Sequence, residues 1–330
     1  MTGLVLRRVG HGLLVVWAAY TLTFLLLYVL PGDPVTTMLS GTGQVEATPE
    51  QVARLRAHYG LDSSLPVQYL HSLAGLVTGD LGTSYLTGGS VASALAETVP
   101  GTVRLAVAAL VLGTTAGGVV AVAAVYTRHR RLARVLAALP VLGVSVPTFW
   151  VGLLLLQIFS FQLGWVPALG GGGLAGVVLP ALTLAVPVAA TVGQVLLRTL
   201  SDTWTRQFVT TFHAAGVPRH RLLVSHALRA SLGPVLSVAG VLAGELLGGA
   251  VVVETVFTRN GVGRLLTTSV TAQDVPVVLG VVLFSAVVFV TVNIAADLLR
   301  PVVDARTAPT NGPARRRRAT ARPEPGRIPA

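Results

Sequence analysis

The sequence predicts an all-α, polytopic membrane protein with six transmembrane helices and a small extracytoplasmic helical cap after the first of them. Hydrophobic residues make up 52% of the 330 residues and charged residues only 11%, against about 25% charged in an ordinary soluble domain. Six apolar segments reach the length of about 20 residues that a helix needs to cross a bilayer. None has the alternating polarity of a barrel strand, so these segments are expected to be helices.

The six predicted spans are distributed along most of the chain. They cover residues 9–30, 102–126, 135–160, 177–197, 234–257 and 277–299. The first follows Arg7 and Arg8, as the core of a signal peptide would. Its 22 residues exceed the usual 7–15 of such a core. We therefore interpret it as a retained transmembrane helix.

The arginine residues predict the orientation of the chain. The net charge is +11, all 24 basic residues are arginine, and lysine is absent. Nineteen of the 24 lie in the N-terminus, in residues 127–134, in residues 198–229 and in the tail after residue 299. Because basic residues accumulate on the cytoplasmic side of a membrane, both termini are expected to be cytoplasmic.

The spans and the charge pattern predict four segments. They are the cytoplasmic N-terminus with the first helix (1–30), an extracytoplasmic segment (31–101), a five-helix core with a cytoplasmic loop at 199–233 (102–300), and a disordered basic tail (301–330). The tail contains four consecutive arginines, which favour contact with anionic membrane lipid. Inner-side arginine is already explained by topology, so no nucleic acid partner is expected.

Local signals predict two helices within the extracytoplasmic segment. Thr48 and Gln51 have the spacing of a capping box with Pro49 at the first helical position, and Gly60 can end this helix. A second helix is expected to begin after Ser64. These two helices would form the cap.

The sequence lacks the residues of several kinds of chemical site. Cysteine is absent, and no Walker A motif is possible without lysine. The seven histidines have no metal-ligand spacing. We therefore expect no catalytic residue, no metal and no cofactor. The run Gly170–Gly173 is expected to be a flexible connection.

The loop at 199–233 predicts a short helix, a break and a second helix. Phe208, Phe212 and Ala215 share one helical face, and Gly216 with Pro218 ends that helix. This arrangement suits docking to a partner protein. The other interpretation is a solvated loop that is basic only because it is cytoplasmic.

Glu245 is an acid about halfway along the fifth predicted span. A carboxylate that faces lipid costs at least about 2.5 kcal/mol, so the side chain should face the bundle interior or a water-filled path. One hypothesis is that Glu245 lines the translocation path and attracts a cationic group of the cargo. The other is that it is a protonated or hydrogen-bonded packing residue.

Short sequence blocks follow one another in a specific order along nearly the whole chain. Among them are Leu6-Arg7-Arg8-Val9-Gly10, Pro31-Gly32-Asp33-Pro34, Tyr59-Gly60-Leu61-Asp62, Gly79-Asp80-Leu81-Gly82-Thr83-Ser84, Ser145-Val146-Pro147-Thr148-Phe149-Trp150, His226-Ala227-Leu228-Arg229, Val253-Glu254-Thr255-Val256-Phe257, Gly261-Val262-Gly263-Arg264 and Asp274-Val275-Pro276-Val277-Val278. In this order and spacing the chain resembles the permease subunit of binding-protein-dependent ABC importers of the dipeptide/oligopeptide/nickel class.

This resemblance implies a transport function and a set of partners. The partners are a second homologous or identical permease, two ATP-hydrolysing subunits and an extracytoplasmic solute-binding protein. The residues expected to dock on the ATPase are Thr210, Thr211, Phe212, His213, Ala214, Ala215, Gly216 and Val217. Here the sequence departs from the family pattern, which usually reads close to Arg-Thr-Ala-Arg-Ala-Lys-Gly-Leu. Because the side chains differ from the family pattern, the resemblance implies where the ATPase docks but not which of these side chains touch it.

The alternative is a secondary transporter or channel that is not driven by ATP, and a membrane-embedded enzyme is a third possibility. A secondary transporter often has paired broken helices and charges at the membrane midplane. An embedded enzyme would need clustered acids or histidines within the spans. The sequence does not distinguish a dipeptide, an oligopeptide, a nickel complex or another solute as cargo.

Overall fold

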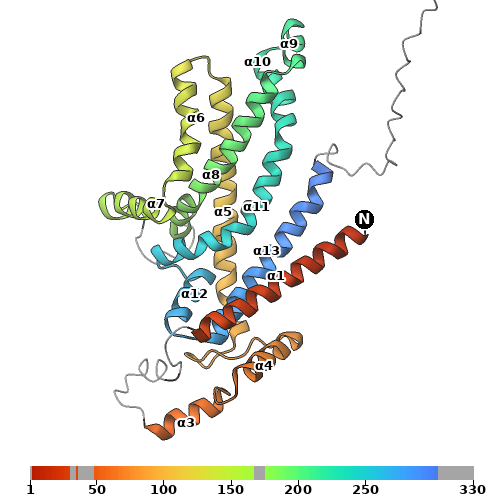
Figure 1. Ribbon diagram of the computed structural model, residues 1–330. Coiled ribbons are helices and arrows are strands. Elements are labelled where there is room, and N and C mark those ends of the chain that lie inside the picture. The colour runs from red at the N-terminus through yellow and green to blue at the C-terminus, as the bar shows by residue number, and fades with distance from the viewer. Residues whose placement is uncertain (1, 30–34, 36–47, 167–174, 304–330) are drawn as a thin grey trace, which may run out of the picture.

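The computed structural model describes residues 2–29, 35, 48–166 and 175–303. The described chain is helical and contains no strand, only an isolated antiparallel bridge between Thr83 and Ser90. Figure 1 shows an elongated bundle with α3 and α4 at one end and α9 and α10 at the other. We call these the cap end and the loop end.

Five continuous helical segments of the described chain are long and apolar enough to cross a membrane, which confirms the predicted all-α membrane fold. They belong to α1 (Thr2–Val29), α5 (Val91–Tyr126), α8 (Ala175–Trp204), α11 (Arg229–Val256, reached through α10 and η2) and α13 (Val275–Val303). Each overlaps one of the predicted spans. Three segments discussed above lie outside the described residues. They are the block Pro31-Gly32-Asp33-Pro34, the run Gly170–Gly173 and the tail from residue 304.

The third predicted span, 135–160, is wrong as a single helix. The segment forms α6 (Arg130–Ser145), then α7 (Thr148–Leu155) continued by η1 (Leu156–Gln162), and the two parts are bent by 104°. Val146 between them is extended, with φ −90° and ψ 127°. Because a residue before proline is disfavoured in the helical region, Pro147 imposes this break. Counted as one broken span, the pair raises the number of candidate spans to six, and Figure 1 shows α7 lying across the direction of α6.

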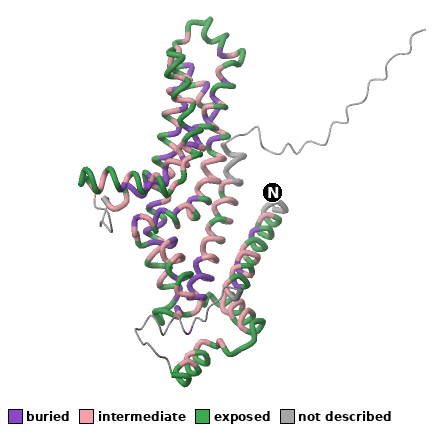
Figure 2. Tube along the Cα trace, turned by 60° about the vertical axis from the view of Figure 1, so that its left-hand side comes forward, coloured by how far each residue is buried: buried purple, intermediate pink, exposed green. Residues whose placement is uncertain are grey.

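Helix α8 forms the centre of the core. Leu184, Val188 and Val192 follow one another at helical spacing and are all buried. Helix α5 packs closely against them because it presents glycines to α8: a Cβ at Gly113 would lie 2.8 Å from the carbonyl oxygen of Ala185. Figure 2 shows buried residues gathered where these helices meet, while one side of α1 is exposed along its length.

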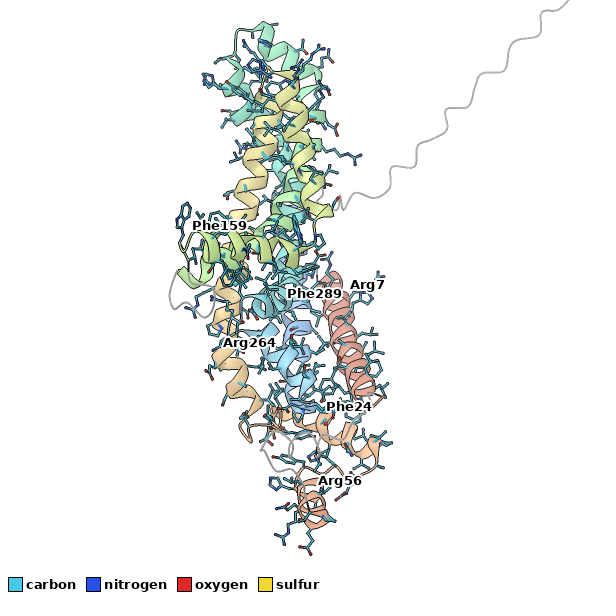
Figure 3. The ribbon with its side chains drawn as sticks, turned by 90° about the vertical axis from the view of Figure 1, so that its left-hand side faces the viewer. Arg7, Phe24, Arg56, Phe159, Arg264 and Phe289 are labelled. Atoms are coloured by element: carbon cyan, nitrogen blue, oxygen red, sulfur yellow. The ribbon has the colours of Figure 1, made fainter. Side chains whose placement is uncertain are left out.

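The cap helices begin and end where the local signals predict. In α3 (Pro49–His58) the amide of Gln51 donates to Thr48 Oγ1 at 3.4 Å, and the amide of Thr48 donates to Gln51 Oε1 at 3.2 Å. This is the predicted capping box. Helix α4 (Leu65–Thr78) ends at Gly79, whose φ of +79° favours glycine. Figure 3 places Arg56 on the cap and Arg7 near the opposite end of α1.

Candidate functional site

The predicted docking segment forms a short helix and a sharp turn at the loop end. Helix α9 covers Gln207–Ala214, and α10 (Arg219–Leu222) continues into η2 (Leu223–Leu228). Between them Gly216 has φ +82°, and the amide of Val217 donates to the carbonyl oxygen of Phe212 at 3.1 Å. The predicted helix end at Gly216 is confirmed, because this left-handed conformation favours glycine.

The eight predicted docking residues have different surroundings. Some line a cavity or pack within the chain, and the others do neither. His213 and Val217 line a cavity under the helix, next to the buried Val209. Phe212 packs within the chain, with its ring centroid 4.7 Å from that of His226. Phe212 and His213 nevertheless remain exposed, Phe212 at 36%. The exposed residues that neither line this cavity nor pack on His226 are Thr210, Thr211, Ala214, Ala215 and Gly216. These five residues are therefore the part of the segment that is free to meet another molecule.

Arg219 fixes the position of the loop end on the bundle. Its Nη2 donates to the carbonyl oxygen of Val125 at 3.1 Å. The guanidinium carbon also lies 5.4 Å from the ring centroid of Tyr126 and 5.5 Å from that of Trp204. These contacts are cation–π interactions, which join the ends of α5 and α8 to the start of α10.

Glu245 lies on a face of α11 that the described chain does not cover. Its side chain is exposed and makes no hydrogen bond to the described residues, whereas its neighbours Gly244 and Leu246 are buried. Gly248, one turn further along, is also exposed, and a Cβ there would meet nothing within 4 Å. Gly244 instead packs on α13, where a Cβ would lie 3.2 Å from the ring of Phe289.

The cap end contains a buried carboxylate, Glu254, that joins three helices. Its Oε1 accepts a hydrogen bond from Thr102 Oγ1 of α5 at 2.6 Å. Its Oε2 accepts from the amides of Gly263 at 2.7 Å and Arg264 at 3.3 Å, in the first turn of α12 (Val262–Thr271). Thr102 Oγ1 also accepts from the amide of Val262 at 2.9 Å. Glu254 therefore caps α12 from the neighbouring helix α11.

The glycines before and within α12 permit this arrangement. A Cβ at Gly261 would collide with the carboxyl group of Glu254, and a Cβ at Gly263 would collide with the backbone of Val251. The block Gly261-Val262-Gly263-Arg264 thus fits the block that contains Glu254. Two of the sequence blocks that carry the family resemblance therefore meet in space.

A second buried carboxylate, Asp274, secures the loop between α4 and α5. It accepts hydrogen bonds from Ser84 Oγ at 2.5 Å, from the amide of Tyr85 at 3.0 Å and from the amide of Leu86 at 3.4 Å. Asp274 is 2% exposed and Ser84 is 4% exposed. This joins another two of the blocks, which lie 190 residues apart in the sequence.

Sequence reasoning missed the roles of Glu254, Asp274 and Arg219. Glu254 and Asp274 entered it only as members of the sequence blocks. A usable signal was the Gly-x-Gly pair of Gly261 and Gly263 at the start of the amphipathic segment 262–271, because the free amides of such a helix start need an acceptor. Within the described ranges, no three His, Asp or Glu side chains are grouped so as to hold a metal ion.

Comparison with known proteins gives two family models that together cover most of the chain. The model described as "Binding-protein-dependent transport system inner membrane component" matches residues 98–309, and the model of the N-terminal part of such membrane components matches residues 1–106. A solved crystal structure of an amino acid ABC transporter with histidines aligns with 65% of this chain and 94% of that chain. Its TM-score of 0.49 and its identity of 14% are too low to locate residues.

Relatives are similar over almost their whole length. A Brucella abortus (strain 2308) protein, whose name assigns it to a peptide transport system as a permease protein, is 36% identical over 314 residues. This covers 93% of the chain and 99% of the relative. The glutathione transport system permease protein GsiC of Salmonella choleraesuis (strain SC-B67) is 35% identical over 283 residues, which covers 86% of the chain and 91% of the relative.

Proposed function

The chain belongs to the family of binding-protein-dependent transport system inner membrane components, and on this basis we propose that it is the permease subunit of an ABC importer for peptides, including small ones such as glutathione. Family membership and the near full-length similarity to two transport permeases carry this proposal. It is a multi-pass inner-membrane protein whose own part is to form a passage. In this function it catalyses no covalent reaction.

The uncovered face of α11 supports pairing with a second permease. A carboxylate on that face would be costly in lipid, because transfer of Glu or Asp to the membrane centre is unfavourable. In a pair of permeases the face that carries Glu245 and Gly248 lies against the partner or along the passage between them. Glu245 would then attract the cationic amino terminus of a peptide.

The loop end is the proposed contact with two ATP-hydrolysing subunits. Thr210, Thr211 and Ala214 are exposed, while Arg219 and Phe212 attach the same segment to the bundle. A short helix held in this way transmits movement as a rigid lever. The switch between inward-open and outward-open states then follows the closure of the ATPase pair, because each state has its own contacts there.

This proposal fixes the orientation of the chain. The loop end and both termini are cytoplasmic, and the cap end faces the extracytoplasmic solute-binding protein. The positive-inside distribution of arginine supports it.

Purification of the complex tests this function directly. The full chain, tagged and extracted from its native membrane in mild detergent, should carry ATP-hydrolysing subunits and a second permease at fixed stoichiometry. A monomer or homodimer without an ATPase, with transport driven by an ion gradient, would contradict the proposal. Uptake of labelled dipeptide and of labelled glutathione by cells with and without the chain then assigns the cargo.

A substitution pair at Gly216 tests the docking segment. Asn and Asp are similar in shape and both tolerate the left-handed conformation, so the pair isolates charge. A Cβ there meets nothing within 4 Å inside the chain. Gly216→Asp should therefore abolish ATPase coupling by placing an unpaired charge in the interface, while Gly216→Asn retains most of it. Equal coupling in both variants would place the ATPase contact elsewhere.

A further inference from the structure

The loop end contains a cavity of about 590 Å³ that neither the proposed passage nor the exposed face of α9 uses. It lies between α9, α10 and the connection from α5 to α6 (Figure 1). Its lining includes Arg128, Arg219 and His213 beside the indole ring of Trp204. None of the eight lining residues is acidic. The cavity is therefore a cationic site lined on one side by an aromatic ring.

The guanidinium of Arg219 is fixed in position and has N–H donors available for an anion. One of its nitrogens donates to the carbonyl oxygen of Val125, and the group lies near the rings of Tyr126 and Trp204. Its other N–H groups have no hydrogen-bond partner among the described residues. Because the side chain is already ordered, little rotamer entropy is lost when it binds. A guanidinium with free donors matches the oxygens of a phosphate group.

The cavity lies where three candidate spans end. Two of them end at Tyr126 and Trp204, and the third begins at Arg219. Large apolar side chains near these ends are exposed, with Leu132 at 47% and Val224 at 60%. Leu132 follows the lining residue Arg128 by four residues, and Val224 follows the lining residue Leu222 by two. Aromatic residues at span ends mark the headgroup level of a bilayer, where the cytoplasmic leaflet carries anionic lipid.

From this juxtaposition we propose that the cavity binds the phosphate of an anionic phospholipid of the inner leaflet. Arg219 and Arg128 are its phosphate ligands, and the acyl chains lie along the exposed apolar side chains of α6 and η2. The bound headgroup holds α9 against the α5–α6 connection. This fixes the position of α9, the helix proposed to contact the ATPase. This assignment rests on the proposed function, since that makes the loop end cytoplasmic.

Native mass spectrometry of the purified complex, stripped of lipid and titrated with phosphatidylglycerol or phosphatidylcholine, tests the site. The wild-type complex should retain phosphatidylglycerol in preference to phosphatidylcholine. Arg219→Gln and Arg128→Gln should each bind phosphatidylglycerol about tenfold more weakly, which is about 1.4 kcal/mol. Arg221→Gln is the matched control, because this exposed arginine on α10 does not line the cavity. Arg128 is exposed and makes no hydrogen bond to the described residues, so its removal should not disturb the fold.

Several outcomes overturn the proposal. One is equal retention of phosphatidylglycerol by the Arg128, Arg219 and Arg221 variants, or equal retention of phosphatidylcholine by the wild type. Displacement of the lipid by millimolar inorganic phosphate would assign the site to a free anion. If the wild-type complex binds no lipid and the Arg219→Gln complex loses the ATPase, the cavity binds an acidic side chain of the ATPase subunit instead. A complex that contains the ATPase but binds no lipid contradicts this inference alone, whereas lipid binding without any ATPase contradicts the proposed function.

Discussion

The two ends of the bundle use their polar groups in opposite ways. At the cap end, Glu254 and Asp274 are buried, and each accepts three hydrogen bonds from donors elsewhere in the chain. At the loop end, Thr210 is exposed and most donors of Arg219 have no partner among the described residues. The two buried carboxylates near the cap end are thus satisfied within the chain, whereas Arg219 at the loop end has donors left for other molecules.

This difference assigns mechanical roles to the two ends. A satisfied buried network holds its elements in one arrangement, because moving any member leaves a polar group unpaired. The cap end should therefore move as one body during transport. The loop end is held on the bundle by Arg219 and by the contact of Phe212 with His226, while the exposed residues of α9 remain available to partners.

The largest effect is expected from Glu254→Ala. It leaves the buried amide of Gly263 without its acceptor, at about 1–3 kcal/mol, and also removes the acceptor of the half-buried amide of Arg264. Thermal unfolding of the purified protein should show a large drop in Tm, with loss of the contact between α12 and α11. Glu254→Gln retains one carbonyl oxygen and should lose much less. A Tm like that of wild type for the alanine variant would contradict the rigid cap end.

Asp274→Asn should have an intermediate effect. One oxygen is replaced by an amide that cannot accept from Ser84 or from the backbone, so one buried hydrogen bond is lost, at about 1–3 kcal/mol. The matched control is Asp80→Asn, because the exposed Asp80 side chain accepts, among the described residues, only from the amide of Gly82, at 2.9 Å. Protease accessibility of the loop at 83–90 should rise in the first variant and stay unchanged in the second. Equal accessibility in both would remove the assigned role of Asp274.

Glu245→Gln should leave stability unchanged and alter transport selectively. The side chain is exposed and makes no hydrogen bond to the described residues, so its charge contributes little to the fold. Uptake of cationic peptides should fall more than uptake of neutral ones, at equal amounts of protein in the membrane. If uptake of both falls equally, or falls only because less protein is inserted, Glu245 has a packing role instead.

Labelling of single cysteines should have the smallest effect on the protein and tests which end is outside. The chain has no native cysteine, and Ser63 and Ser225 are both exposed. In intact cells a membrane-impermeant thiol reagent should label Ser63→Cys on the cap and spare Ser225→Cys on η2. The reverse pattern would invert the orientation that the arginine distribution predicts.

Features that depend on neighbouring residues could be predicted from the sequence. The capping box of Thr48 and Gln51 spans four residues, and the helix end at Gly216 depends on that residue and the following Pro218. The break before Pro147 was also a local signal. The apolar run continues on both sides of this proline. Composition alone therefore predicts one helix, which conceals the break.

Features that join distant residues could not be predicted in the same way. Thr102 and Glu254 are 152 residues apart, and Ser84 and Asp274 are 190 apart. No periodicity pairs such positions, because helix packing brings them together only after the spans assemble. Likewise, the spacing of Phe208, Phe212 and Ala215 predicts that they share one helical face. It does not indicate that Phe212 packs on His226. The fold was therefore more predictable than the site.

The contact between α9 and the ATPase is the central claim, and photo-crosslinking from α9 tests it most directly. A benzoylphenylalanine residue at Thr211, on the exposed face of α9, should yield a covalent adduct with the ATP-hydrolysing subunit in native membranes. The same residue at Val224, which is 60% exposed on η2, should yield none, because that apolar position is expected to face lipid. An adduct from position 224 and none from position 211, in a complex that still contains the ATPase, would contradict docking through α9.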